Sequence, residues 1–554
     1  MMKNYKNYFL ALFLGLGSAI TVVAQDDMEV VWEKKYDHAA ESFGLGLEGE
    51  YSYIADDKEI SLISNESGEI KWTKPFKEIA ERLKKVDAIV PLWDANAIFL
   101  FDQKMGKEQI AVADLATGNA IWASDSYKGI TPQSVTYIKE YDVFLFDLKD
   151  GLHCVDAKTG KVKWENSSFI GKTASLYLTD KEEGSMTMVN IQSANWFAFK
   201  GWKNQLMKID MNTGKTVWEN VYRGEVEKKV FTGELLLYNL SVKDGKVFLK
   251  LNGLQVFDYK SGKNLWTAAF DFTPDGGLNR GSYSDNSFKR TYGAVAQPFA
   301  EGDDIFVLDM SSKSKQYLKK YDKHTGKLIW TSADFNKTKA IPTMFMMGNV
   351  VILQIGGMLE QHIKSTSTNS QTGGSSVSNS IEYNRVGPFG LKAINVATGK
   401  LVWESEKFKK GISNIVDDNG TLIVASSKVI YKIDPKSGEV KYEKALKGDG
   451  IGNANVLFPL DSQVLIVGDK GVSKHNVESG KLEGSVKWKK AGLFSIKNGY
   501  VILITAKKDV AAINVETLKV NVHDAKKDTG AKISVNGDYL YLFRKKTIVK
   551  LKVY

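Results

Sequence analysis

The sequence has almost no cysteine: among 554 residues, Cys154 is the only one. A chain with a single thiol cannot form an internal disulfide. Cys154 lies in the alternating stretch GLHCVDAKTG, and this pattern favours a small buried side chain over a reactive thiol. Proline is also scarce, with 9 residues against 48 glycines, which suits many tight turns better than proline-rich linkers.

Long hydrophobic runs are missing after residue 24. Residues 1–24 combine a basic start, an apolar run over 9–20 that is too short to span a bilayer, and small residues before position 25. We therefore expect a signal peptide cleaved after Ala24, and a mature chain 25–554 that is periplasmic or secreted and has no transmembrane segment. No cysteine follows the apolar run, so a lipoprotein is not expected.

The short motifs of common active sites are also absent. The sequence has no paired-histidine zinc motif, no G-x-S-x-G elbow and no phosphate-binding loop. Its six histidines stand apart, at positions 38, 153, 324, 362, 475 and 523. The net charge of +10 comes from lysines interleaved with acids, which indicates solubility rather than a basic stripe for nucleic acid. We predict no catalytic residues, no metal site and no nucleic-acid partner.

What the sequence does contain is one short motif, repeated many times. An apolar strand pattern is followed by Asp or Asn, Thr or Ser, a Gly, and a Trp four residues after that Gly. Seven copies keep this spacing, at 65–72, 114–122, 156–164, 210–218, 258–266, 322–330 and 395–403. The copy at 434–442 has Tyr442 in place of Trp, and the copies at 476–484 and 514–522 lose the aromatic residue.

The motif predicts a hairpin turn. The Asp or Asn side chain can accept hydrogen bonds from backbone amides two residues on, and Gly supplies a positive φ. The Trp then falls on the returning strand, always on the same face. A large aromatic residue repeated once per unit is typical of packing between neighbouring units.

Each unit contains about four short strands, which we call A to D, and the Thr-Gly turn joins C to D. The stretch NGTLIVASSKVIYKID (419–434) shows two of them with a short polar turn between. Units recur every 38 to 73 residues, a period typical of propeller blades. We predict an all-β fold, a β-propeller of four-stranded antiparallel blades with about 10–11 blade units.

The two chain ends predict how the ring closes. EVVWEKKY (29–36) is a D strand with no A, B or C before it, and 536–554 holds a B and a C strand with no D after them. Together they complete one blade, so Trp32 should pair with residues near 546–553. Such closure hides sheet edges that would otherwise promote aggregation. We favour a single ring over two nested tori.

The repeats resemble the PQQ-type propeller repeat over most of the mature chain, from Trp32 onward. Two families carry it: the quinoprotein alcohol dehydrogenases and the non-enzymatic BamB-like proteins, which are scaffolds in outer-membrane protein assembly. The resemblance implies that aromatic residues dock between adjacent blades, here Trp32, Trp72, Trp122, Trp164, Trp218, Trp266, Trp330, Trp403 and Tyr442.

This chain departs from both families. They usually have eight blades, and BamB is a lipoprotein. The dehydrogenases hold their quinone with adjacent cysteines and a calcium ion, whereas this chain has one cysteine and no recognisable calcium cluster. We therefore expect no cofactor, and PQQ in particular is not expected.

Insertions fall on one face of the predicted ring. The D-to-A and B-to-C connections share a face, and five long ones decorate it: a charged helical piece at 75–86, and the segments 193–204, 273–293, 309–316 and the low-complexity loop 356–390. Insertions gathered on one face of a repeat protein usually mark its binding face.

Two groups of residues on that face are candidate binding sites. Trp196, Phe197, Phe199 and Trp202 form an aromatic loop that is either a binding hot spot or a plug over the central channel. Arg280, Tyr283, Arg290 and Tyr292 form a second patch or a solvated loop. The Ser/Thr/Asn run 365–380 has a composition that cannot build a core.

These observations favour an exported, non-enzymatic propeller that binds a protein partner, for which an outer-membrane or envelope complex is the candidate. A quinone-dependent enzyme or small-molecule binder is one alternative, and a glycan-binding module is another. The sequence does not decide between them.

Overall fold

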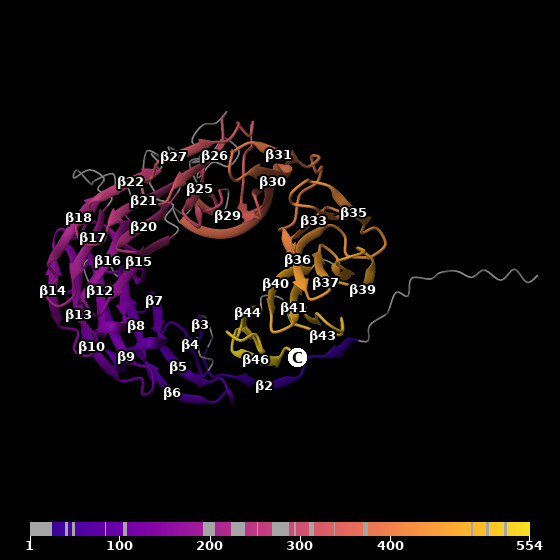
Figure 1. The fold of residues 1–554 in the computed structure, drawn as a ribbon. Helices are drawn as coiled ribbons and strands as arrows, with labels where there is room; N and C mark the ends of the chain where they lie inside the picture. The colour runs from indigo at the N-terminus through magenta and orange to yellow at the C-terminus, as the bar shows by residue number, and fades with distance from the viewer. Residues whose placement is uncertain are drawn as a thin grey trace, which may run out of the picture.

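The computed structural model describes residues 25–38, 42–46, 50–83, 85–103, 108–191, 205–222, 239–251, 253–268, 287–292, 295–309, 315–336, 338–368, 375–488, 491–505, 509–525 and 529–554. Its strands form eleven sheets, which are antiparallel apart from one added N-terminal strand and stand side by side in one ring (Figure 1). The predicted propeller is confirmed, and the structure has eleven blades. We number the blades from the first complete one along the chain.

The first six blades follow one another along the chain, with only β23 (Ser287–Tyr292), a strand of blade 7, between blades 5 and 6 among the described residues. Blade 1 holds β3 (Ser42–Leu45), β4 (Tyr51–Ala55), β5 (Glu59–Ser64) and β6 (Ile70–Pro75). Blade 2 holds β7 (Ala88–Leu92), β8 (Ala97–Asp102), β9 (Gln109–Asp114) and β10 (Ala120–Ser124). Blade 3 holds β11 (Val135–Ile138), β12 (Val143–Leu148), β13 (Gly151–Asp156) and β14 (Val162–Asn166). Blade 4 holds β15 (Lys172–Asp180), β16 (Ser185–Ile191), β17 (Gln205–Asp210) and β18 (Thr216–Val221). Blade 5 holds β19 (Asn239–Lys243), β20 (Lys246–Leu251), β21 (Gly253–Asp258) and β22 (Asn264–Ala268). Blade 6 holds β24 (Phe299–Glu301), β25 (Asp304–Asp309), β26 (Tyr317–Asp322) and β27 (Leu328–Thr331).

The remaining blades include three with an added or borrowed strand. Blade 7 holds β28 (Thr343–Met347), β29 (Val350–Thr368), β30 (Ser375–Asn395) and β31 (Leu401–Glu404), with β23 (Ser287–Tyr292) added. Blade 8 holds β32 (Val416–Asp418), β33 (Thr421–Ser426), β34 (Val429–Ile433) and β35 (Val440–Ala445). Blade 9 holds β36 (Ala454–Leu460), β37 (Gln463–Gly468), β38 (Gly471–Asn476) and β39 (Leu482–Lys487). Blade 10 holds β40 (Ala491–Lys497), β41 (Tyr500–Thr505), β42 (Val510–Asn514) and β43 (Val520–His523), with β1 (Gln25–Asp27) added. Blade 11 holds β44 (Gly530–Ile533), β45 (Tyr539–Arg544), β46 (Thr547–Lys552) and the borrowed β2 (Val30–Lys35).

The C-to-D turns form as the motif predicts. In blade 2, the backbone amide and hydroxyl of Thr117 both donate to Asp114 Oδ1 at 2.8 Å, and the Gly118 amide donates to the Asp114 carbonyl at 2.8 Å. Gly118 has a φ of 68°, in the left-handed region that glycine adopts without strain. The same bonds recur in the turns that begin at Asp156, Asp210, Asp258, Asp322, Asn395, Asp434, Asn476 and Asn514.

A bulge near the start of the D strand in every Trp-bearing blade was not predicted. In blade 3, Val162 pairs with Val155 while Trp164 pairs with Cys154, so two residues of β14 face one step of β13. The shift occurs at the same place in the other Trp-bearing blades. A bulge increases the local strand twist and re-aims the side chain that follows it. That side chain is the docking aromatic.

The chain ends close the ring as predicted. β2 pairs antiparallel with β46, with Trp32 opposite Lys550 and Lys35 opposite Thr547. The N-terminal segment also forms a pairing that was not predicted: β1 adds to blade 10 in parallel with β43. Met28, between the two strands, is buried among Leu540, Leu551 and other residues of blades 10 and 11. The first residues described therefore join the last two blades.

The hydrophobic core is divided among the blade interfaces. Eleven clusters of buried apolar residues lie between successive blades, one per interface. The cluster between blades 11 and 1 contains Trp32, Tyr541 and Phe43. An open row of eleven blades would have only ten interfaces. The eleventh cluster shows one closed ring.

Two predicted segments differ from the structure. A loop is expected over 356–390, but the described residues of this range belong to β29 and β30, which pair with each other out to Thr368 opposite Ser375. Residues too polar for a core can still form strands, because Ser- and Thr-rich arms satisfy their backbones by pairing with each other. Among the described residues of 75–86, where a helical piece is expected, the structure contains a single helical turn, α1 (Phe76–Ile79).

Candidate functional site

Nine of the D strands carry an aromatic residue that contacts the next blade. Trp164 is 6% exposed, and its indole Nε1 donates to the carbonyl oxygen of Met211 in blade 4 at 2.8 Å. The indole also lies against Gly214 of the same turn, where a Cβ would come within 2.5 Å of the ring. The turn glycine is therefore required twice, for its positive φ and for the close approach of the indole.

This arrangement recurs around the ring. The same hydrogen bond to the following blade, at 2.8–3.1 Å, is donated by Trp32, Trp72, Trp122, Trp218, Trp330 and Trp403. Trp266 and Tyr442 pack against the next turn glycines, Gly326 and Gly480. The Trp266 indole N–H has no hydrogen-bond partner among the described residues.

A second contact between blades was missed by sequence reasoning. Lysines stand opposite the docking aromatic in four blades, and their ammonium groups reach the following blade. Lys550 donates to the carbonyl of Asn65 at 2.7 Å, and Lys432 donates to Glu478 at 2.8 Å. Burial acts to lower the pKa of Lys432, but the hydrogen bonds that its ammonium group donates to Glu478 and Asp418 outweigh burial and raise the pKa. The sequence feature that could have predicted this contact is a lysine at the same position of the C strand in several repeats.

The strand order places the long connections on one face. D-to-A and B-to-C connections alternate with the short A-to-B and C-to-D turns, so they all emerge on the opposite side from the Thr-Gly turns. The segment after β6 packs inward as well, since Phe76, Ile79 and Leu83 are buried between blades 1 and 2. Lys77 and Glu78 on the same segment are exposed.

The largest described feature of that face is a three-stranded extension of blade 7. β29 and β30 continue beyond the blade after a bulge at Gly356, and β23 pairs with β29 from Glu360 to Ser365. Figure 1 shows the curved β29 at the inner side of the ring. We call the paired backbone of β23 with residues 357–368 and 375–386 the blade 7 extension.

Of the eight predicted binding residues, the structure describes only Arg290 and Tyr292. Trp196, Phe197, Phe199, Trp202, Arg280 and Tyr283 lie outside the described residues. Arg290 and Tyr292 belong to β23, where their backbones pair with His362 and Glu360 of β29. Their segment is therefore a strand of the blade 7 extension rather than a loop.

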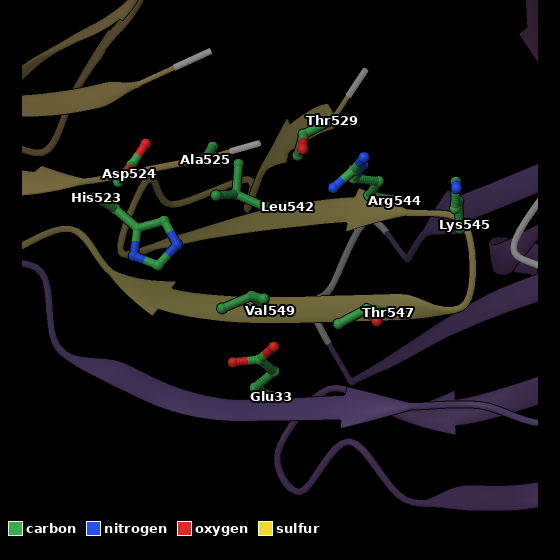
Figure 2. A pocket seen from close by; sticks show the side chains of 10 residues that line it. All are labelled: Glu33, His523, Asp524, Ala525, Thr529, Leu542, Arg544, Lys545, Thr547 and Val549. Carbon is green, nitrogen blue, oxygen red and sulfur yellow. The ribbon is translucent and has the colours of Figure 1, made fainter. Parts of the chain in front are cut away.

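A polar pocket of about 400 Å³ lies at the ring closure, between blades 10 and 11. Figure 2 shows Glu33 on β2, Thr547 and Val549 on β46, Arg544 on β45, and His523 with Asp524 beside them. Burial lowers the pKa of His523. The pocket mixes acidic and basic side chains without a nucleophile positioned by a base, which gives it no evident catalytic arrangement.

One buried group resembles a catalytic triad in composition only. Ser473 Oγ lies 3.0 Å from His475 Nε2, and Asp449 Oδ2 lies 3.3 Å from that same nitrogen. In a proton relay the carboxylate and the hydroxyl contact opposite ring nitrogens. Here the other nitrogen, Nδ1, faces the carbonyl of Gly480 at 3.3 Å.

One set of metal-ligating side chains was missed by sequence reasoning. Ligand atoms of His38, Asp56 and Glu59 all lie within 4.8 Å of one another. They belong to the connection after β2 and to the turn between β4 and β5, also on the face with the insertions. The histidine is separated from the carboxylates along the chain, so no sequence motif marks the group.

Among the described residues, no helix has the length and apolar character needed to cross a bilayer. Cys154 is buried, and burial raises the pKa of its thiol to about 12, in line with the structural role expected from its strand pattern.

These observations define the class of protein: a β-propeller with PQQ-type repeats. In most blades an aromatic residue of the D strand packs against the C-to-D turn of the following blade. The chain belongs to the family described as outer membrane protein assembly factor BamB, whose model matches residues 17–177, 179–284 and 389–530. The stretch between the second and third matches contains β23, β29 and most of β30. No curated protein matches the chain significantly.

Several solved structures are similar to the chain. BamB from Moraxella catarrhalis is 15% identical, with 69% of this chain and 93% of that one covered and a TM-score of 0.29. The computationally designed Ika8 protein is 12% identical, covering 68% of this chain and 95% of that one, with a TM-score of 0.32. The Dos1 propeller is 11% identical, covering 69% and 93%, with a TM-score of 0.33.

Proposed function

We propose that this protein is an exported, non-enzymatic scaffold that binds a protein partner in the cell envelope through the face with the insertions. The family description, an outer membrane protein assembly factor, supports a partner within an outer-membrane or envelope complex. The signal peptide expected at 1–24 supports export to the periplasm or beyond.

The blade 7 extension is the observation that carries the proposal. It adds a paired surface to one face of the ring, where residues 360–365 of β29 lie between β23 and β30. The outer edges of such a small sheet offer backbone donors and acceptors to an extended peptide, a common mode of protein recognition. The opposite face carries mostly uniform short turns, which offer much less variety for a specific contact.

The chemistry of the site supports a binding role over catalysis. The described pocket at the ring closure has no activated nucleophile, and the Ser473 group has no relay geometry. The proposal includes no quinone. Added PQQ is expected to leave the melting temperature and the visible spectrum of the purified protein unchanged.

Affinity purification from cell envelopes tests the proposal. In the trimmed variant, residues 361–382 are replaced by Asn-Gly, because Glu360 and Tyr383 are paired and a two-residue turn can join them. The variant should keep its melting temperature within a few degrees and lose the partner that the full chain recovers.

A matched control changes the other face. Lys260, exposed in the C-to-D turn of blade 5, is replaced by Glu, and this variant should recover the partner fully. Equal recovery by the full chain and the trimmed variant would overturn the assignment of binding to the blade 7 extension.

A further inference from the structure

The geometry points to a binding site for a divalent transition-metal ion, Zn²⁺ in the first instance, formed by His38, Asp56 and Glu59. Their ligand atoms lie within 4.8 Å of one another, and His38 Nδ1 lies 3.8 Å from Asp56 Oδ2. Zinc–nitrogen and zinc–oxygen distances of about 2.0–2.2 Å place two ligands of one ion up to about 4.4 Å apart. Side-chain shifts of a few tenths of an ångström would bring the three atoms around one ion.

The imidazole is held in place from behind. His38 is 7% exposed, and its Nε2 lies 2.7 Å from Ser61 Oγ, which in turn lies 2.8 Å from Thr73 Oγ1. A hydrogen bond at one ring nitrogen orients the other toward a metal, and such supporting contacts raise metal affinity. Ser61 and Thr73 come from paired strands, β5 and β6, so the support is rigid.

The carboxylate of Asp56 is oriented by its own turn. Its Oδ1 accepts the backbone amides of Lys58 at 2.8 Å and Glu59 at 3.1 Å. Because those bonds use Oδ1, the other oxygen is directed toward His38. The same turn places Glu59 at the start of β5, beside the pair.

The donor set selects the class of ion. One imidazole nitrogen and two carboxylates form a mixed nitrogen and oxygen set, which suits Zn²⁺ or Mn²⁺, whereas Mg²⁺ and Ca²⁺ prefer oxygen ligands alone. Two negative carboxylates balance a divalent charge. Asp56 is 15% exposed at its side chain, which leaves an approach from solvent and a position for a water ligand.

The location indicates what the ion would do. His38 lies just after β2, the borrowed strand of blade 11, whereas Asp56 and Glu59 belong to blade 1. A bound ion would therefore fasten the closing strand to the following blade. This effect is independent of the partner binding proposed above.

Metal titration of the purified mature chain tests the site. Protein stripped with a chelator and dialysed is titrated with Zn²⁺ against a competing indicator, in the presence of excess Mg²⁺. We expect one tightly bound Zn²⁺ per chain and a higher melting temperature with Zn²⁺ than without. Asp56→Asn, which keeps the turn acceptor, and Glu59→Gln should each weaken Zn²⁺ binding at least tenfold and remove the thermal shift.

A second histidine with two carboxylates provides the matched control. His153 Nε2 lies 3.0 Å from Asp150 and its Nδ1 lies 3.4 Å from Glu165, so these carboxylates face opposite ring nitrogens and cannot share one ion with it. Glu165→Gln should therefore bind Zn²⁺ as the unaltered chain does. If Asp56→Asn fails to fold, Glu59→Gln alone decides, since the Glu59 side chain makes no hydrogen bond or ion pair among the described residues. Unchanged Zn²⁺ affinity in the Asp56→Asn and Glu59→Gln variants, or no saturable binding at all, would overturn the proposal.

Discussion

At the scale of the residue, glycine sets how closely two blades approach. Each docking aromatic lies against the turn glycine of the following blade, and a Cβ on Gly160 would come within 2.5 Å of the Trp122 indole. The hydrogen bond from Trp122 Nε1 to the Ala157 carbonyl, at 3.0 Å, fixes the indole beside that turn. The turn glycine therefore has two roles: it allows the left-handed backbone of the turn, and it lets the indole of the preceding blade pack closely.

Gly160→Ala tests this double requirement. Gly160 and Gly245 have nearly equal φ values, 66° and 68°, but nothing lies within 4 Å of a Cβ on Gly245. Gly245→Ala should cost about 1 kcal/mol for the left-handed backbone alone. Gly160→Ala should cost about 1–3 kcal/mol more, because the indole must move. Denaturant unfolding of both variants measures the difference. Equal losses would contradict the docking role of the turn.

Single-residue patterns predicted the turns but not the lysine contacts. The docking aromatic can be predicted from its spacing, since each copy that has one places it four residues after the glycine. The lysine opposite it occurs in only some blades, and its partner lies in the next blade. The sequence around the lysine does not contain its partner, so no local pattern could predict the contact. The contact between His38 and Asp56 could not be predicted for the same reason, because the two residues are far apart in the sequence and only the fold brings them together.

At the scale of the element, the turn carboxylates link the C-to-D hairpins to pH. Hydrogen bonds from the backbone amide and hydroxyl of Thr213 lower the pKa of Asp210. Asp156, Asp258, Asp322 and Asp434 have lowered pKa values from equivalent bonds. A lowered folded pKa adds stability above the unfolded value near 4, and this stability is lost as the pH falls through the folded pKa.

Asp210→Asn separates the turn from its charge. The asparagine at position 395 keeps the same acceptor bonds, with the amide and hydroxyl of Thr398 at 2.9 and 3.0 Å. We expect the variant to match the parent at pH 7 within about 0.5 kcal/mol. Between pH 5 and pH 3 it should lose less stability than the parent. Identical acid unfolding curves would show that this carboxylate carries no pH dependence.

The blade 7 extension marks the limit of element prediction. The Ser/Thr/Asn composition of 365–380 predicted a loop, yet Thr366 pairs with Val377 and Ser367 with Ser376. Composition reports whether side chains can build a core, whereas the pairing here is between backbones. The register between two strands is a property of the pair, and the sequence of either strand alone does not show it.

At the scale of the whole molecule, the ring closes because each chain end lacks what the other supplies. The repeat pattern predicted that the N-terminal strand completes the last blade, and the pairing of Trp32 with Lys550 confirms this prediction. The choice between one ring and two nested tori depends on contacts between distant blades. The eleven interfaces of the structure decide it, and the parallel strand β1 adds a contact that no repeat pattern contains.

A designed disulfide across the closing strands tests the closed ring most directly. Glu33 on β2 is opposite Val549 on β46, and antiparallel partners lie about 4.5–5.5 Å apart at Cα, within disulfide range. In a Cys154→Ser background, Glu33→Cys with Val549→Cys should form a disulfide on mild oxidation, detected by mass spectrometry and by thiol blocking, and should raise the melting temperature.

The matched control shifts the register. Thr547 pairs with Lys35, so Glu33→Cys with Thr547→Cys places the two cysteines on a diagonal, with their Cα atoms about 7–8 Å apart. The account predicts rapid bond formation in the first pair and little in the second. Failure of the first pair to form a bond, or equal bonding in both pairs, would contradict a ring closed by strands from its two ends.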